Sequence, residues 1–196
     1  DPEVGWRCLT ADVVGCDFYD VLIGPQGEVY VVIGDVSGSG PLAALFMAMT
    51  SCLMGILVQE GLPPGRMLEL ANKILHPHLS RRRMLITAQI ARYHSASNTL
   101  ALASAGHMWP YIMKKSGPVE VPLTGLPLGS MPTLDYPEIH TRVAPGQRLL
   151  LYTDGLVECS EPGGEMFGFE RFTAALAEAS LASAADLVES LLARFH

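Results

Sequence analysis

The hydrophobic periodicity of this chain changes twice, and no other feature of the sequence constrains the fold as strongly. Residues 18–23 and 29–33 are apolar and rich in β-branched side chains, and the turn residues Gly24-Pro25-Gln26-Gly27 separate them. Such segments predict two strands joined by a turn. After a predicted loop over residues 34–40, one helical pattern runs from Pro41 to about residue 60, and a second opens at Pro63-Pro64. Proline is favoured in the first turn of a helix.

Strand-like segments return in the second half of the chain, and further helical patterns follow them. The strand candidates cover residues 84–93, 99–104, 109–113, 138–143 and 148–153, and the helix candidates cover residues 169–179 and 184–195. Ser183 is a predicted N-cap, because Asp186 follows three residues later in an approximate capping box. The order of strands, helices, strands and helices predicts an α+β fold in which antiparallel sheets carry helices on their faces.

Composition and charge exclude several classes of protein. Hydrophobic residues make up 49 % of the chain and charged residues 17 %, whereas a disordered chain shows the reverse balance. The net charge is −7 and no basic face is evident, so we expect no nucleic-acid partner. The four cysteines form no C-x-x-C pair, which argues against a zinc ribbon and favours reduced thiols. Because no signal peptide opens the chain, we expect a cytoplasmic protein with its 196 residues in one domain.

One segment is apolar enough to resemble a membrane span. Residues 41–58 are strongly apolar, and no charged residue lies between Val36 and Gln59. Thr50, Ser51 and Gly55 interrupt this run, and no positive flank fixes an orientation. We therefore expect a buried core helix and no membrane insertion of this domain.

Three motifs each place a carboxylate at the end of an apolar strand, with a glycine beside it. They are Gly15-Cys16-Asp17-Phe18-Tyr19-Asp20, Gly34-Asp35-Val36-Ser37-Gly38-Ser39-Gly40 and Tyr152-Thr153-Asp154-Gly155. A carboxylate in such a place is costly unless it is paired, hydrogen-bonded or bound to a metal. Residues 1–59 contain seven carboxylates and a single base, Arg7. Because converging oxygen ligands suit Mg²⁺ or Mn²⁺, we predict that Asp17, Asp35 and Asp154 converge in one metal site.

Each motif also has a simpler interpretation, and at this stage these alternatives stay open. Asp17 or Asp20 would cap a turn, Asp35 would cap the glycine-rich turn, and Asp154-Gly155 would form a hairpin turn. Gly38-x-Gly40-x-x-Ala43 also resembles the dinucleotide fingerprint between a strand and a helix. A nucleotide-binding α/β domain that uses the Gly38-Ser39-Gly40 loop is therefore an alternative function.

Other polar residues are expected to be structural. His76 and His78 resemble a metal pair but fit a helix end, and Arg81-Arg82-Arg83 fits a solvated loop better than an anion contact. His107 is a possible proton donor, but we expect a structural histidine in a turn.

Six motifs in this order resemble the SpoIIE/RsbU-like branch of the PPM metal-dependent serine/threonine phosphatases. The first two carboxylate motifs are similar to the family's GGDFYD and GDVSGHG, and residues 150–158 are similar to LLYTDGLxE. Ala105-Gly106-His107 matches AGH, Gly125-x-Pro127-Leu128-Gly129 matches G-x-P-L-G, and Gly164-Glu165-x-Phe167-Gly168 matches the segment near the end. The resemblance covers nearly the whole chain.

The resemblance implies an αββα sandwich, with two stacked antiparallel β-sheets flanked by α-helices and a binuclear Mn²⁺ or Mg²⁺ centre. Asp35 would bridge both ions, the Val36 carbonyl would complete one of them, Asp154 would bind the second, and Asp17 would hold an ion or its water. A metal-activated water would then attack phosphorus in line. The implied substrate is phosphoserine or phosphothreonine on a STAS-type anti-anti-sigma protein, in sigma-factor regulation. A sensor or receiver domain is expected upstream. The resemblance is compatible with a homodimer as well as with a monomer.

The chain departs from the family pattern at three places. Cys16 replaces a glycine, which reduces backbone freedom, and Ser39 replaces the histidine of GDVSGHG. The family's C-terminal D-D-x-T motif has no counterpart before His196. We therefore expect the last strand and its aspartate to be missing and the second metal site to be incomplete, unless Asp20 supplies the fourth carboxylate. A catalytically impaired, phosphatase-like regulatory module is the second alternative function.

Overall fold

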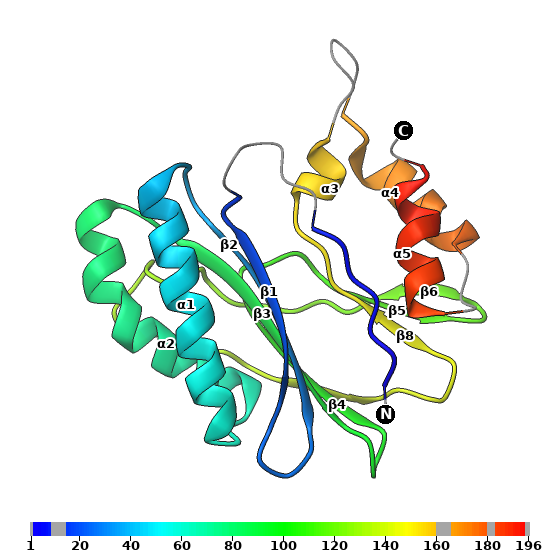
Figure 1. Cartoon of the computed structure of the whole chain (residues 1–196), viewed down its shortest axis with the longest axis horizontal. Helices are drawn as coiled ribbons and strands as arrows, with labels where there is room; N and C mark the ends of the chain where they lie inside the picture. Colours follow the sequence, from blue (N-terminus) through cyan, green and yellow to red (C-terminus); the bar gives the residue numbers. More distant parts are fainter. Residues whose placement is uncertain (1, 9–14, 160–165, 180–182, 195–196) are drawn as a thin grey trace. The chain divides into compact units, whose positions relative to one another are not determined.

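Two compact units make up the chain, whose structure is a computed structural model that describes residues 2–8, 15–159, 166–179 and 183–194 (Figure 1). The five-stranded unit comprises Thr10–His107 and Leu123–Arg142. The three-stranded unit comprises Asp1–Leu9, Met108–Pro122 and Val143–His196. Each unit contains one antiparallel sheet, and each also contains helices. This confirms the predicted α+β class.

The five-stranded unit is built on a fully antiparallel sheet. Its strands are β1 (Asp17–Ile23), β2 (Val29–Val36), β3 (Ile86–His94), β4 (Thr99–Ala105) and β7 (Ile139–Arg142). They lie in the order β1-β2-β3-β4-β7, and each matches a predicted segment closely. β2 is longer than predicted, because Gly34 and Asp35 pair with residues of both neighbouring strands. These two residues therefore lie in a strand and not in the expected loop.

Two helices cover one face of this sheet. They are α1 (Pro41–Gln59) and α2 (Pro64–Leu79), and the short 3-10 turn η1 (Ser80–Arg82) follows α2. Both helices carry a proline in the first turn, as predicted. Figure 1 shows α1 and α2 side by side against the sheet. Phe18 and Val32 of the sheet pack with Met54 and Leu68 of the helices in one buried core.

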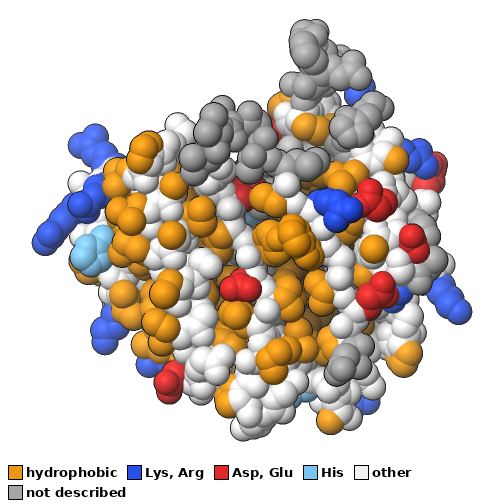
Figure 2. All heavy atoms as spheres, in the orientation of Figure 1, with side chains coloured by type: hydrophobic (Ala, Val, Ile, Leu, Met, Phe, Trp, Pro, Cys, Tyr) orange, Lys and Arg blue, Asp and Glu red, His pale blue; other side chains and the backbone are white. Residues whose placement is uncertain are grey.

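Only part of α1 is buried, whereas the sequence predicts a buried core helix. Ala43, Phe46 and Met54 face the core, but Leu45 is 57 % exposed and Ile56 is 59 % exposed. Figure 2 shows hydrophobic side chains gathered over this helix. By length and composition alone, α1 is the one helix in the described residues that could cross a membrane, and a core helix of a soluble protein passes the same test.

The three-stranded unit has its own sheet and its own core. Its elements are β5 (Tyr111–Lys114), β6 (Gly117–Glu120), β8 (Arg148–Leu150), α3 (Gly155–Glu158), α4 (Gly168–Glu178) and α5 (Ala184–Leu192), with strand order β6-β5-β8. Tyr152 and Phe172 pack with their ring centroids 4.6 Å apart, and Tyr111 meets Phe172 edge-on. The predicted N-cap of α5 is confirmed, because the Ser183 hydroxyl accepts the Asp186 N–H at 2.9 Å. β6 and α3 were not predicted.

Candidate metal centre

Asp17 and Asp35 lie directly opposite each other in the ladder between β1 and β2. Side chains of directly opposed residues point to the same face of a sheet, with Cβ atoms about 4.5–5.5 Å apart. Two carboxylates in such positions repel each other, and a divalent cation held between them would offset that repulsion. The donor chemistry of this pair therefore fits the predicted metal, and two of the three predicted aspartates are brought together.

The pleat of β1 determines which face of the sheet carries this pair. Phe18, the next residue, is buried under the helices, so Asp17 and Asp35 lie on the face directed away from α1 and α2. Asp20 is an even number of residues from Phe18 and shares its face. Its Oδ1 accepts the backbone N–H of Val21 at 2.8 Å. Asp20 is therefore separated from the pair by the sheet itself, and the expectation that it could supply a missing carboxylate is wrong.

Gly34 lets β2 pack closely enough to hold Asp35 in this register. A Cβ at Gly34 would lie 2.6 Å from Cζ of Phe18 and 2.6 Å from the carbonyl oxygen of Thr87. The first contact is with a buried ring and the second is with the backbone of β3, so neither neighbour has room to move. The glycine before Asp35 is thus required by packing within the sheet.

Hydrogen bonds with the residues just before β1 and β3 hold the backbone that follows Asp35. The Val36 N–H donates to the Cys16 carbonyl at 3.3 Å, and the Ser37 N–H donates to the Leu85 carbonyl at 2.9 Å. The Ser37 hydroxyl in turn accepts the Leu85 N–H at 2.8 Å. These bonds fix the backbone around Val36, whose carbonyl is a predicted metal ligand. That role stays a prediction.

Glycine is also needed further along this turn, at Gly38 and Gly40, which have φ angles of 97° and 81°. Ser39 lies exposed between them. The Cys16 thiol donates to the Gly38 carbonyl at 3.2 Å, so the residue that replaces the family's glycine ties the first motif to the second. Cys16 does not adopt a positive φ, and its substitution for glycine is unstrained. The N-cap residue of α1 is Gly40 and not Asp35.

The strand arrangement around this turn does not fit a dinucleotide site. The dinucleotide fingerprint joins a strand to a helix that leads into a parallel strand. Here β2 pairs antiparallel with both β1 and β3. The glycines of the turn therefore serve a different fold, and the nucleotide-binding alternative is not supported.

Asp154 belongs to the three-stranded unit, and it begins a helix. It is the N-cap residue of α3, and its carbonyl accepts the N–H groups of Val157 at 2.8 Å and Glu158 at 2.9 Å. Asp154-Gly155 is thus not a hairpin turn. Among the described residues, no three His, Cys, Asp or Glu side chains form a ready-made cage for an ion. The convergence of Asp154 with the Asp17–Asp35 pair stays a prediction.

A residue that sequence reasoning missed lies beside Asp35. Thr87 of β3 is the register partner of Asp35, so its hydroxyl is on the same face as the carboxylate pair. The Thr87 hydroxyl lies 2.9 Å from Nδ1 of His107, a residue that is only 7 % exposed. The backbone N–H of His107 donates to the Ser104 hydroxyl at 3.0 Å. These contacts place a polar chain next to Asp35, and the structural role of His107 stays a prediction.

The remaining polar candidates lie where they were expected. His76 and His78 are in the last turn of α2, and Arg81 and Arg82 are exposed on η1. Of the motif near the C-terminus, Phe167 and Gly168 open α4, whereas Gly164 and Glu165 lie outside the described residues.

Relatives of this chain are found over most of its length. Residues 25–196 match the family described as stage II sporulation protein E (SpoIIE). Phosphoserine phosphatase RsbU of Bacillus subtilis (strain 168) is 27 % identical over 164 residues, which cover 83 % of this chain and 48 % of RsbU. Protein IcfG of Synechocystis sp. is 26 % identical over 186 residues, which cover 81 % of this chain and 29 % of IcfG. The chain thus spans about half the length of RsbU and a smaller part of IcfG.

Solved structures share the fold. The SiaA-PP2C domain of Pseudomonas aeruginosa gives a TM-score of 0.80 at 23 % sequence identity. The matched region covers 94 % of this chain and 74 % of the SiaA chain. The PP2C phosphatase domain of the cell fate determinant SpoIIE from Bacillus subtilis gives a TM-score of 0.73 at 17 % sequence identity. The matched region covers 93 % of this chain and 53 % of the SpoIIE chain. These likenesses show that the chain has the fold of PP2C phosphatase domains.

Proposed function

This chain belongs to the SpoIIE/RsbU branch of the PPM (PP2C-type) serine phosphatases, and we propose that it hydrolyses phosphoserine or phosphothreonine on a protein. The observation that carries this proposal is the opposed pair Asp17 and Asp35, which lies within two of the family's motifs. A phosphate monoester is anionic, so cations held between it and these carboxylates would offset their mutual repulsion.

We propose that Asp17, Asp35, Asp154 and the Val36 carbonyl hold two Mn²⁺ or Mg²⁺ ions. Carboxylate and carbonyl oxygens are the ligands that these hard cations take, and the repulsion between Asp17 and Asp35 supports a cation between them. When bound, the ions would supply charge neutralisation and an activated water for in-line attack on phosphorus.

The chain's own residues orient these ligands. Gly34 allows β2 to lie against Phe18, which keeps Asp35 opposite Asp17. The paired hydrogen bonds between Ser37 and Leu85 restrict the backbone that carries the Val36 carbonyl. Ligands that are held before the ions bind need less ordering when the ions arrive.

The substrate we propose is a phosphorylated STAS-type anti-anti-sigma protein, with a sensor or receiver domain elsewhere in a longer protein. The support is the similarity to RsbU, of which this chain spans 48 %. Sigma-factor regulation and a cytoplasmic location belong to the same proposal.

The test is release of inorganic phosphate, in the presence of Mn²⁺, from a phosphoserine-bearing STAS protein and from a phosphotyrosine peptide. We expect release from the first substrate and little from the second. Asp35→Asn should lower kcat on the order of 10²–10³-fold, which is the usual effect of losing one preorganised electrostatic contact. Asp20→Asn is the matched control, because it makes the same substitution on the opposite face of the sheet and should retain most of the activity.

The outcomes separate the alternatives. Equal losses in Asp35→Asn and Asp20→Asn would contradict the assignment of the metal face. A protein that binds the phosphorylated substrate in the presence of Mn²⁺ but releases no phosphate would instead be the impaired regulatory module, which the exposed Ser39 in place of histidine favours. Absence of both binding and release would refute the proposed function.

A further inference from the structure

A groove of about 670 Å³ lies in the five-stranded unit, on the face of the sheet that α1 and α2 cover. It opens where α2 begins, at Pro63 and Pro64, so the helix does not cover this end of the sheet. The sheet residues that line it and matter here are Arg92, His94, Thr99, Ala101, His140 and Arg142. Its volume is within the range of about 300–1,000 Å³ that is usual for small-molecule sites.

The strand register gives this groove a floor of small residues and walls of basic ones. In one cross-strand row, Ala101 of β4 lies between Arg92 of β3 and His140 of β7. In the next row, Thr99 lies between His94 and Arg142. Because adjacent strands are about 4.7–4.9 Å apart, the two walls stand about 10 Å apart. Long basic side chains on both walls can therefore reach one ligand above the central strand.

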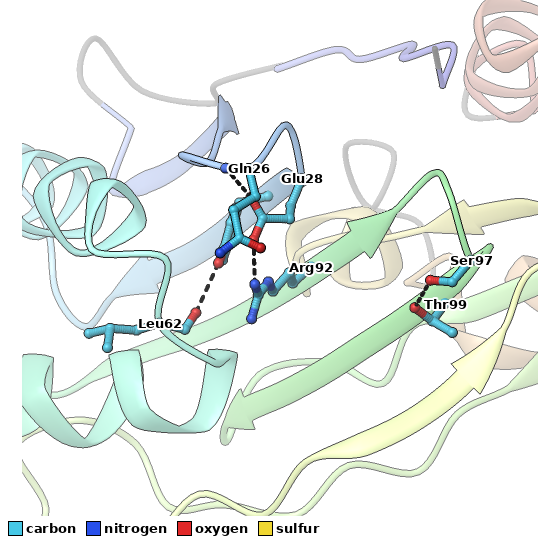
Figure 3. A network of polar contacts seen from close by, with 7 residues as sticks. Gln26, Glu28, Leu62, Arg92, Ser97 and Thr99 are labelled. Carbon is cyan, nitrogen blue, oxygen red and sulfur yellow. Dashed lines mark hydrogen bonds and ion pairs between the residues drawn. The ribbon is translucent and has the colours of Figure 1, made fainter.

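Arg92 is held in place by its surroundings (Figure 3). Its Nη2 forms an ion pair with Glu28, which is almost completely buried, and its guanidinium lies 5.5 Å from the ring centroid of Tyr30. The Tyr30 hydroxyl donates to the Leu62 carbonyl at 3.0 Å, which fixes the ring in turn. Within the part of the chain that the structure describes, the buried Nε of Arg92 has no hydrogen-bond partner. Arg92 is thus oriented while part of its donor capacity stays unused.

The opposite wall supplies the Arg142 guanidinium and the His140 imidazole, with few acceptors near them. Arg142 is exposed and forms no ion pair with any described residue. Glu138 is the one carboxylate that lines the groove among the described residues. Its Oε1 accepts the N–H of Gly65 at 2.9 Å, and its Oε2 lies 3.2 Å from Nε2 of His140. Both oxygens of this carboxylate are therefore engaged, and donors outnumber free acceptors around the groove.

We propose that this groove binds a small anion that carries a phosphate group. Guanidinium groups match the geometry of phosphate oxygens, and the Thr99 hydroxyl, which hydrogen-bonds with the Ser97 hydroxyl at 2.7 Å, adds a polar group beside Arg142. The groove is separate from the carboxylate pair. Arg92 is paired with Tyr30 near the start of β2 on the helix-covered face, whereas Asp35 is near the end of β2 on the other face. The proposal therefore does not depend on the phosphatase activity.

The test is calorimetric titration of the protein, freed of metal ions on a chelating resin, with inorganic phosphate and separately with AMP. Removing the metal ions keeps phosphate away from the carboxylate pair. We expect saturable binding that weakens at least tenfold in Arg142→Gln. Arg81→Gln is the matched control, because it removes the same charge from an exposed arginine on η1, and it should leave binding unchanged. Ala101→Leu leaves the charges of the groove unchanged but places a larger side chain at its base. It should therefore abolish binding of AMP.

The two probes distinguish the sources of the phosphate group. Equal affinities would identify free phosphate as a sufficient ligand, and tighter binding of AMP would identify an organic phosphate. The proposal is overturned if neither probe binds, or if Arg142→Gln and Ala101→Leu bind both probes as the unmodified protein does. Arg92 is not used as a test position, because its removal would leave Glu28 buried without its partner.

Discussion

Replacing Glu28 with glutamine tests the buried ion pair that orients Arg92. The Glu28 side chain is 1 % exposed and the Arg92 side chain is 16 % exposed. Removing one partner of a buried pair costs about 3–5 kcal/mol, because the other charge stays buried. Glutamine retains a hydrogen-bond acceptor, so we expect a loss at the lower end of this range. The free energy of unfolding should fall by about 3 kcal/mol. For a chain of this length that corresponds to a fall in Tm of about 6–12 °C.

The pH dependence of this effect has a definite sign. Burial alone would raise the pKa of Glu28, but hydrogen bonds from Arg92 and from backbone N–H groups outweigh it, and the net pKa lies below the ordinary value of 4.5. The unfolded chain therefore binds a proton at higher pH than the folded one does. The stability from Glu28 is fully present above about pH 4.5 and is lost as the pH falls through the lower, folded-state pKa.

The assay is urea unfolding followed by circular dichroism, at pH 7 and at several values below pH 4.5. The difference between the unmodified protein and Glu28→Gln should be largest at pH 7 and should shrink in acid. Glu69→Gln is the matched control, because the Arg66–Glu69 pair is exposed and should contribute about 0–1 kcal/mol. A loss in Glu28→Gln as small as the control's, or one that does not change with pH, would refute the reasoning.

Four further substitutions test the packing and the candidate metal centre. Gly34→Ala should lower the free energy of unfolding by about 1–3 kcal/mol, because its Cβ meets Phe18 and the backbone of β3, and it should also reduce phosphatase activity by displacing Asp35. Gly55→Ala, whose Cβ meets no atom within 4 Å, should instead stabilise α1 by about 0.5–1 kcal/mol in the same unfolding assay. Asp17→Asn should weaken Mn²⁺ binding at least tenfold in calorimetry, and unchanged affinity would remove Asp17 from the ligand set. Phe172→Ala should destabilise the protein by about 3–5 kcal/mol, measured as a lower urea midpoint.

Most elements of the fold could be predicted from local sequence patterns, and the exceptions have physical reasons. β6 contains Gly117 and Pro118, which disfavour a strand, and it forms because it pairs with β5. Gly34 and Asp35 resemble the start of a loop, but they lie in β2 because β1 and β3 supply backbone partners on both sides. In both cases non-local pairing outweighs local propensity.

The candidate site was predictable in its residue types but not in its geometry. The motifs identified Asp17 and Asp35, whereas only the register shows that the two face each other and that Thr87 lies beside Asp35. One signal in the sequence could have excluded Asp20. It follows Asp17 by three residues, and an odd spacing on a strand places two side chains on opposite faces. The basic groove depends on rows that join three strands, so no local pattern reveals it.

The position of β1 at the end of the five-stranded sheet gives its aspartates a second consequence. Among the strands that the structure describes, β1 pairs only with β2 in this sheet, so its outer edge carries backbone groups that another extended chain could pair with. Carboxylates on such a strand discourage self-association, because two copies brought edge to edge would bring their negative charges together. Exposed Ile23 at the end of β1 would favour that association. Variants that neutralise Asp17 or Asp20 therefore remove a safeguard against aggregation as well as a charge, and their solubility will depend on protein concentration.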